Sequence, residues 1–172
     1  GAGHVAAPGS AGDPDAVAMS LYRYALDVVS NAGVLPVLPP VLVREEAMYG
    51  TGFFPTDRGN IYAVESDNLY LTGTSEVALA GLHMGEILPE ADLPLRYCGL
   101  SSCFRREAGT AGKDMRGIVR THQFEKVEMF PFCHPDRPGE GHEHLPWFGR
   151  EIAGHHGLHH RPPRSTRPCA TH

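Results

Sequence analysis

Residues 95–132 read LRYCGLSSCFRREAGTAGKDMRGIVRTHQFEKVEMFPF, and this stretch decides the fold that we expect. Leu95–Glu107 and Val119–Phe132 have the character of two long strands. Between them, Ala108–Asp114 consists of small and polar residues with two glycines, which is typical of a hairpin loop. The sequence contains few other helical segments, so it predicts an α+β domain built on an antiparallel sheet.

The residues before this hairpin begin with a predicted helix. Asp13-Pro14 resembles a helix start with proline at the first helical position, and apolar residues follow at helical spacing. Asn31-Ala32-Gly33 is a typical helix end. Val34–Val43 is apolar but contains three prolines, which favour an edge strand or an extended crossing segment.

The middle of the chain predicts a second hairpin and a second helix. Asn60–Val64 and Leu69–Thr72 flank the turn-forming residues Ser66-Asp67-Asn68. Ser75–Leu88 has apolar residues at helical spacing, and Pro89 is expected to end that helix.

The strand expected over 119–132 has an unusual distribution of charge. Side chains alternate between the two faces of a strand. One face carries a cation, an aromatic ring and a carboxylate at short intervals: Arg120, His122, Phe124, Lys126, Glu128 and Phe130. These groups suit a phosphate, a flat base and an amine. The alternative is a solvated edge strand with scattered charges, because neither face is apolar before Val127.

The preceding strand adds a second charged pair. Arg105 and Glu107 point to the same side, and a guanidinium can hold a phosphate or carboxylate in a bidentate fork. Lys113 and Arg116 add positive charge in the loop. The pattern is consistent with a site for a nucleoside triphosphate, although no Walker P-loop sequence occurs. A surface ion-pair ladder is the alternative.

The segment Thr72-Gly73-Thr74-Ser75-Glu76 has two interpretations. Hydroxyl residues followed by an acidic first turn are typical of a capped helix start. The same hydroxyls and carboxylate could also converge on a small polar ligand.

Composition limits the class of protein. The 172 residues are 41% hydrophobic and 20% charged, which is a globular balance. The net charge of −5 argues against a DNA-coating protein, and no apolar run approaches the roughly 20 residues of a membrane span. Four cysteines form no recognisable zinc or disulfide framework. We therefore expect a soluble, cytoplasmic protein without membrane or DNA partners.

The composition also divides the chain into three parts. Residues 1–13 are expected to form an irregular leader, 14–136 the folded domain, and 137–172 a tail rich in His, Pro and Arg, with at most a short helix near Trp147–Ile152. The histidine spacing in the tail allows zinc binding on a helix, but the neighbouring glycines and prolines oppose a helix there. We expect no metal site.

Several motifs together resemble bacterial seryl-tRNA synthetase, a class II aminoacyl-tRNA synthetase. Ala47–Pro55, Leu71–Glu76, Cys103–Asp114 and Arg116–Phe130 carry the resemblance, and the last two match the family's motif 2 almost continuously. Gly33–Pro40 resembles motif 1, the dimer-interface element. The resemblance covers about residues 16–136. It implies an antiparallel sheet flanked by helices, and a two-step reaction in which serine and ATP give seryl-adenylate before transfer to tRNA(Ser).

The resemblance also implies roles for individual residues. Arg105 would be the catalytic residue, bridging the α-phosphate and the serine carboxylate. Its companions at the ATP site would be Arg106, Glu107, Arg120, Thr121 and Phe124, where Glu107 accepts from the adenine amino group and Phe124 stacks on the base. The serine site would comprise Thr74, Ser75, Glu76, Arg105 and Glu128.

The chain departs from the family pattern in two places. The N-terminal helical arm that grips tRNA and the whole of motif 3, which supplies a Mg²⁺ ligand, have no counterpart in this sequence. We therefore expect a truncated serine–tRNA ligase fragment that pairs through motif 1, with a tail that is either disordered or read out of frame or from a degraded gene. Two alternatives are a ligase that loads an amino acid onto a carrier protein, and a non-catalytic dimerisation module.

Overall fold

The computed structural model describes residues 14–107, 121–142, 148 and 151–152. Its first sheet contains β1 (Leu35–Val37), β5 (Leu95–Phe104) and β6 (Gln123–Phe132), in the order β1-β5-β6. The two long strands pair antiparallel in continuous register from Leu95↔Phe132 to Phe104↔Gln123, whereas β1 pairs parallel with β5. The predicted antiparallel α+β fold is confirmed, with one parallel edge strand added.

Both long strands are shorter than predicted. β5 ends at Phe104 rather than Glu107, because the backbone N–H of Arg106 donates to the Asn60 carbonyl at 2.9 Å instead of to β6. Glu107 then takes a left-handed backbone conformation with φ of 53°, which turns the chain away from the sheet. At the other end, β6 begins at Gln123, and the predicted strand residues 119–120 lie outside the described part of the chain.

The second sheet contains β2 (Leu42–Arg44), β4 (Leu69–Leu71) and β3 (Ala63–Val64), in the order β2-β4-β3, and both pairings are antiparallel. The predicted second hairpin is therefore confirmed, with Asn68 in the left-handed conformation at its turn. The proline-rich segment from Val34 to Val43 divides between the sheets, since β1 lies at the edge of the first and β2 in the second.

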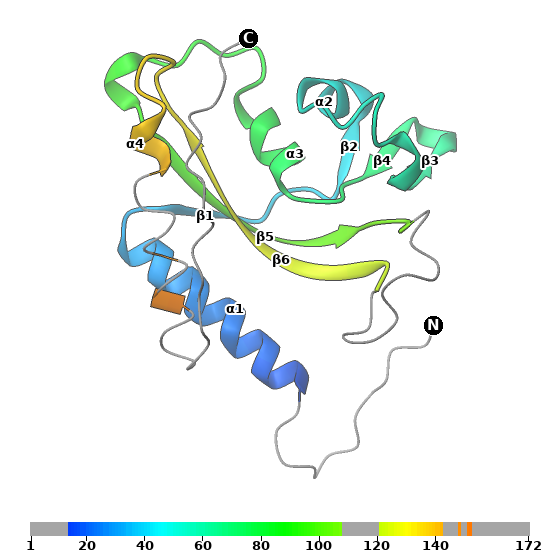
Figure 1. The fold of residues 1–172 in the computed structure, drawn as a ribbon, viewed down its shortest axis with the longest axis horizontal. Coiled ribbons are helices and arrows are strands. Elements are labelled where there is room, and N and C mark those ends of the chain that lie inside the picture. Colours follow the sequence, from blue (N-terminus) through cyan, green and yellow to red (C-terminus); the bar gives the residue numbers. More distant parts are fainter. Residues whose placement is uncertain (1–13, 108–120, 143–147, 149–150, 153–172) are drawn as a thin grey trace.

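Helices cover opposite faces of the first sheet (Figure 1). The predicted N-terminal helix is confirmed as α1 (Pro14–Asn31), which lies on one side of β5 and β6. Its Val29 packs with Val34, Cys98 and Phe148 in a buried cluster. On the other side lie α2 (Glu45–Gly50), α3 (Glu76–Ala80) and the second sheet. No helix in the described ranges is long and apolar enough to cross a membrane.

The second predicted helix is much shorter than expected. α3 ends at Ala80, and a 3₁₀ turn, Gly81–His83, follows it in place of the predicted continuation to Leu88. The chain leaves the helix because the His83 imidazole is held by the Tyr97 hydroxyl at 2.8 Å and by the Glu86 carboxylate at 2.8 Å. Gly85, with φ of 80°, then reverses the direction of the chain. Pro89 is therefore not the helix end.

The segment predicted as a tail also contributes structure. A short helix, α4 (Gly139–His142), follows β6, and the Phe148 side chain is buried in the cluster beside α1. Phe148, Glu151 and Ile152 are helical, in agreement with the predicted short helix there. The leader at 1–13 and the histidine-rich residues 153–172 lie outside the described residues.

Candidate functional site

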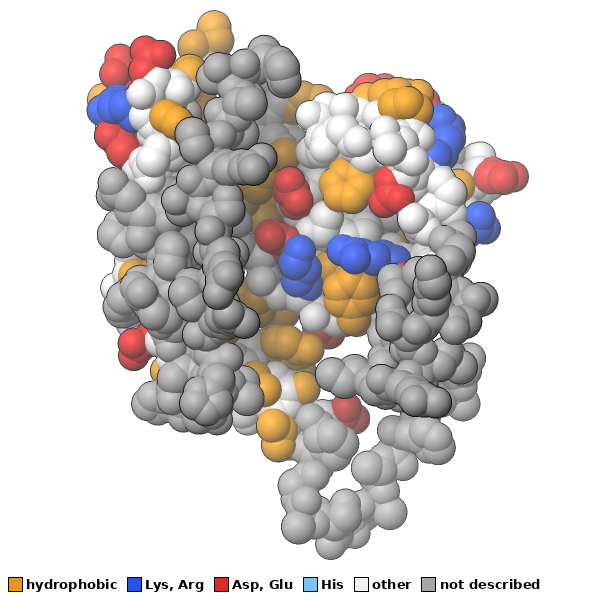
Figure 2. All heavy atoms as spheres, viewed as in Figure 1, with side chains coloured by type: hydrophobic (Ala, Val, Ile, Leu, Met, Phe, Trp, Pro, Cys, Tyr) orange, Lys and Arg blue, Asp and Glu red, His pale blue; other side chains and the backbone are white. Residues whose placement is uncertain are grey.

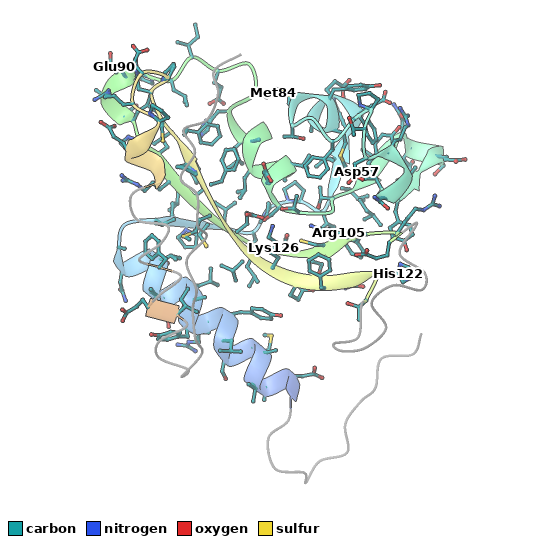
Figure 3. All side chains as sticks on the ribbon, viewed as in Figure 1. Asp57, Met84, Glu90, Arg105, His122 and Lys126 are labelled. Carbon is teal, nitrogen blue, oxygen red and sulfur yellow. The ribbon has the colours of Figure 1, made fainter. Side chains whose placement is uncertain are left out.

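The sheet face beneath α3 carries the polar residues that the sequence placed on one side of β6. The register sets residues of this face directly opposite one another, as the pairs Cys103/Phe124, Ser101/Lys126, Gly99/Glu128 and Tyr97/Phe130. Lys126, on β6, and Arg105, just after β5, point toward the space below α3 (Figure 3). Figure 2 shows basic and acidic side chains gathered over hydrophobic ones in the middle of this face. The two-residue period of the sequence therefore identified one continuous polar surface.

Arg105 is held at the open end of this surface. Its Nε donates to the Gly73 carbonyl at 3.2 Å, and its guanidinium carbon lies 5.4 Å from the centre of the Phe124 ring. The Phe104 N–H donates to the Thr72 carbonyl at 2.9 Å, which fixes the loop before α3 against β5. A guanidinium bound at one edge and resting on an aromatic ring has a defined orientation, which suits recognition of an anion.

Thr74, Lys126 and Glu128 form a polar cluster beside Arg105. The Thr74 hydroxyl donates to Glu128 Oε2 at 2.6 Å, and Lys126 Nζ donates to Thr74 Oγ1 at 3.0 Å. Lys126 Nζ also forms an ion pair with Glu128 Oε2. Thr74 comes from the loop before α3, whereas Lys126 and Glu128 lie at alternate positions of β6. Residues that are 52–54 positions apart in the sequence therefore meet at one point. The cluster can bind an amine and a hydroxyl.

The other residues of the loop before α3 take different positions. Thr72 and Ser75 are completely buried, and neither hydroxyl has a hydrogen-bond partner among the described residues. Glu76 is exposed. The start of α3 is capped in an unusual way. Ser75, the N-cap residue, makes no side-chain cap bond, and Thr74 Oγ1 accepts from the Glu76 N–H at 3.3 Å instead. Of the three residues Thr74, Ser75 and Glu76, only Thr74 joins the polar cluster in this structure.

A second group of polar contacts holds the strand ends that flank the Gly-rich loop. The Arg105 N–H donates to the His122 carbonyl at 2.9 Å, and the Tyr62 hydroxyl lies 3.0 Å from His122 Nδ1. The Arg106 guanidinium carbon lies 5.4 Å from the centre of the Tyr62 ring. These contacts tie the first sheet to the segment that leads into β3, and they fix the backbone from which Arg105 projects.

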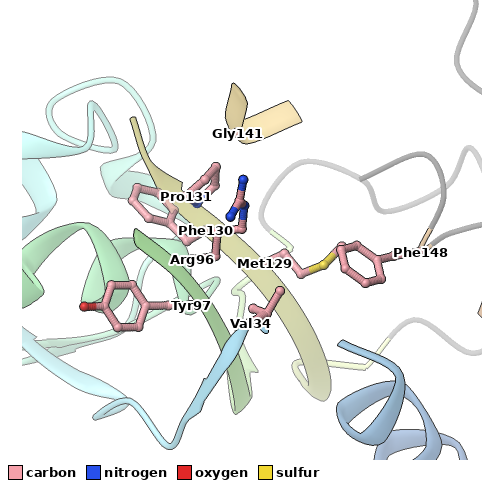
Figure 4. Close-up of a pocket in the computed structure, with 8 residues that line it drawn as sticks. All are labelled: Val34, Arg96, Tyr97, Met129, Phe130, Pro131, Gly141 and Phe148. Carbon is pink, nitrogen blue, oxygen red and sulfur yellow. The ribbon is translucent and has the colours of Figure 1, made fainter. Parts of the chain in front are cut away.

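A separate hollow lies near the start of β5 and the end of β6, and Figure 4 shows the residues that line it. Its lining residues are Val34, Arg96, Tyr97, Met129, Phe130, Pro131, Gly141 and Phe148. Its volume of about 10 Å³ is room for about one water molecule. The open polar surface beneath α3 is therefore the candidate site, and this hollow is not.

Comparison with known proteins agrees with this geometry. Residues 62–144 match the family described as tRNA synthetase class II core domain (G, H, P, S and T). The chain is 51% identical over 136 residues to a serine–tRNA ligase of Mycolicibacterium vanbaalenii and 53% identical over 134 residues to that of Mycobacterium tuberculosis. These matches cover 79% and 78% of this chain. Over most of its length the chain is therefore similar to serine–tRNA ligases.

Two solved structures of seryl-tRNA synthetase relatives superimpose on the chain. The enzyme from Pyrococcus horikoshii, complexed with ATP, gives a TM-score of 0.74 at 46% identity, over 79% of this chain and 30% of that one. The cytoplasmic serine–tRNA ligase from Naegleria fowleri, in complex with AMP, gives 0.70 at 34% identity, over 77% of this chain and 32% of that one. The chain spans about a third of the length of the curated relatives that it matches, 32% for both the Mycolicibacterium and the Mycobacterium ligase.

The structure of this seryl-tRNA synthetase relative places most of the predicted site residues. Arg105, Phe124, Thr74 and Glu128 lie together under α3, while Arg106 lies on Tyr62 and Thr121 is exposed beyond the start of β6. Glu107 is half-buried where the chain leaves β5. Arg120, Lys113 and Arg116 lie outside the described residues. Binding of ATP and serine by these side chains stays a prediction.

Sequence reasoning assigned no individual role to three residues of this site. Lys126 was placed on the correct face by strand periodicity, but no role was assigned to it. Tyr62 and His122 join the two sheets, and their contact spans 60 positions, so local patterns could not indicate it. Gly99, which lies opposite Glu128, is the one further sequence signal for this site. A larger side chain at this position would come too close to Leu79 of α3 and to Ser75 just before it.

The described residues do not fit a metal centre. Within them, no three His, Cys, Asp or Glu side chains lie close enough together to hold an ion.

Proposed function

We propose that this chain carries the ATP and serine sites of a serine–tRNA ligase, and that residues 14–136 form the corresponding part of the catalytic domain. The observation that supports this most is the position of Arg105, which lies on the Phe124 ring and beside the Thr74–Glu128 cluster. One cation thus stands between an aromatic surface suited to a base and a polar pocket suited to an amino acid. The ATP and AMP complexes of two relatives support the same assignment.

In the proposed first step, a carboxylate oxygen of serine attacks the α-phosphorus of ATP. The bond to the β-phosphate oxygen breaks, and pyrophosphate leaves with the electron pair. In this proposal Arg105, which is oriented by the Gly73 carbonyl and the Phe124 ring, contacts both the α-phosphate and the serine carboxylate. Its fixed charge would stabilise the negative charge that builds during the displacement. No side chain has to act as a nucleophile, because positioning and charge lower the barrier.

Substrate choice in this proposal depends on both ends of the site. Phe124 stacks on adenine, while Glu107 accepts a hydrogen bond from the adenine amino group, and Arg106, Arg120 and Thr121 contact the rest of the nucleotide. Glu128 and Thr74 take the serine ammonium and hydroxyl, with Ser75 and Glu76 completing the pocket wall. Alanine is disfavoured because it lacks the hydroxyl that would hydrogen-bond to Thr74 or Glu128.

Transfer of serine to tRNA(Ser) is the second step of the proposed reaction. We propose a cytoplasmic homodimer that pairs through the segment Gly33–Pro40, where the Leu38 side chain is 83% exposed. Three described cysteines, Cys98, Cys103 and Cys133, are free thiols, as expected in a reducing compartment. Magnesium would be bound together with ATP by a ligand from motif 3, which has no counterpart in this sequence.

Binding of a seryl-adenylate analogue tests the proposal. We expect the analogue to raise the melting temperature of the wild-type chain. Arg105→Lys keeps the charge but loses the fork geometry, so we expect the analogue to bind about 10- to 100-fold more weakly. Arg44→Lys, an exposed position on β2, is the matched control and leaves binding unchanged.

No stabilisation of the wild-type chain at high analogue excess would overturn the proposed binding site. Serine-dependent pyrophosphate exchange then separates an adenylating enzyme from a non-catalytic dimerisation module. Charging of tRNA or of a carrier protein by the longer protein separates the two enzyme alternatives.

A further inference from the structure

The polar cluster beneath α3 already holds a primary ammonium group, and that group belongs to the chain itself. Lys126 Nζ donates to Thr74 Oγ1 at 3.0 Å and forms an ion pair with Glu128 Oε2. A hydroxyl oxygen and a carboxylate oxygen are acceptors that an ammonium ion binds well. The Lys126 ammonium therefore shows what kind of ligand this pocket accepts.

The three members of the cluster differ in how freely they can move. Thr74 is only 3% exposed, and its hydroxyl is fixed by the bond to Glu128 and by the Glu76 N–H. The Lys126 side chain is 33% exposed and has four rotatable bonds, whereas the Glu128 side chain is 21% exposed. Of the cluster, Lys126 is thus the member that can leave while the other two keep their positions.

The strand opposite places only small residues against these groups, since Gly99 lies across from Glu128 and Ser101 lies across from Lys126. The space over Gly99 is itself taken by Leu79, Ser75 and Pro39. A ligand ammonium therefore reaches Glu128 and Thr74 by taking the position of Lys126 Nζ, not by lying beside it.

We propose that Lys126 is a tethered placeholder, whose ammonium occupies the site of a free amino acid's α-ammonium and has to be displaced before the amino acid binds. This inference rests on the proposed function. A half-buried carboxylate without a cation is costly, so Lys126 neutralises Glu128 while the site holds no ligand. The same contact competes with the ligand, so the apparent Kd rises in inverse proportion to the fraction of time for which Lys126 is away from the site.

Calorimetric titration of Lys126→Met tests the inference. The substitution keeps most of the stem but removes the ammonium. We expect L-serine and ethanolamine, two primary ammonium compounds with a hydroxyl, to bind about two- to fivefold more tightly, which corresponds to the strength of a partly exposed ion pair. N-acetyl-L-serine lacks the ammonium, and its binding is expected not to tighten. Lys126→Gln provides a second variant if the methionine side chain lowers stability.

Arg23→Met is the matched control for net charge, because Arg23 lies on α1 in an exposed ion pair with Asp27. We expect this control to bind both ammonium compounds as the wild type does. Equal or weaker binding by both Lys126 variants would overturn the inference and make Lys126 a direct ligand contact. Failure of every variant and of the wild type to bind ethanolamine would also overturn it, because the pocket would then not be an ammonium site. Tighter ethanolamine binding without serine-dependent pyrophosphate exchange would support the placeholder and count against the proposed ligase.

Discussion

Cys98 and Glu128 show how two neighbouring strands separate an apolar face from a polar one. Cys98 on β5 is completely buried against Val29 and Val34, under α1. Burial raises the pKa of the Cys98 thiol to about 11, and the negative charge of Glu128 adds to the effect. The folded state therefore favours the neutral, protonated form of the Cys98 thiol.

This pKa predicts a loss of stability at alkaline pH. Below a pH of about 9 the thiol is protonated in both the folded and the unfolded chain, so its contribution is complete. Between about 9 and about 11 the unfolded chain releases the proton while the folded chain keeps it, and the free energy of unfolding falls by up to about 1.4 kcal/mol per pH unit. Urea unfolding across this range, compared with Cys98→Ala, measures the difference.

The control is Cys133→Ala. Partial burial also raises the pKa of the Cys133 thiol, but Cys133 is not fully buried, so its removal is expected to change the pH profile less. Parallel profiles for the wild type and Cys98→Ala above pH of about 9 would contradict the assignment.

At the residue scale, strand periodicity predicted part of the site and no more. Alternation correctly set Phe124, Lys126 and Glu128 on one face, because that relation depends only on neighbours along the chain. The contact of Glu128 with Thr74 joins positions 54 apart, and no local pattern specifies it. The family resemblance alone brought these two residues together before the structure did.

At the scale of elements, the packing of α3 on β5 depends on one glycine. A Cβ added at Gly99 would lie 3.1 Å from Leu79 Cδ1, 3.2 Å from Ser75 Oγ and 3.3 Å from Pro39 Cγ. These contacts are too close on three sides at once. Gly99 thus allows α3 and the loop that carries Thr74 to approach the sheet.

Gly99→Ala is therefore expected to destabilise the fold by about 1–3 kcal/mol, because α3 has to shift away from β5. The shift also moves Thr74 relative to Glu128, so binding of a seryl-adenylate analogue is expected to weaken. Urea unfolding and thermal shift measure the two effects. Gly50→Ala, in α2 and with no atom within 4 Å of the added Cβ, is the control and is expected to be neutral or slightly stabilising. Equal stability of Gly99→Ala and the wild type would contradict this account.

Elements were predictable to the extent that neighbouring residues determine them. α1 and both hairpins followed from helix-end residues, alternation and turn residues. α3 is shorter than its apolar spacing indicated, because His83 binds Tyr97 on β5 and draws the chain out of the helix. The parallel pairing of Leu35–Val37 with β5 likewise depends on a strand about 60 residues later, which the three prolines in its own segment could not reveal.

At the scale of the whole molecule, α3 packs against both sheets. Val77 and Ala78 pack with Met48 and Tyr70 in the second sheet's cluster, while Leu79 lies against Gly99 in the first sheet. The candidate site lies beneath α3, so its geometry depends on both contacts. Binding and folding are therefore expected to be lost together when the packing of α3 on either sheet is disrupted.

The largest exposed apolar side chains on the segment between the sheets belong to Leu35, Leu38 and Leu42. Leu38 is 83% exposed, so a charge there disturbs no described core, but it would be desolvated inside a homodimer. If the segment is the dimer interface, Leu38→Asp should weaken dimerisation about tenfold or more, which sedimentation over a concentration series measures. Ile87→Asp, at a 98% exposed position in the loop after α3, adds the same charge elsewhere and should leave the association unchanged. An equal loss of association in both variants would point to net charge instead, and unchanged association in Leu38→Asp would remove this segment from the interface.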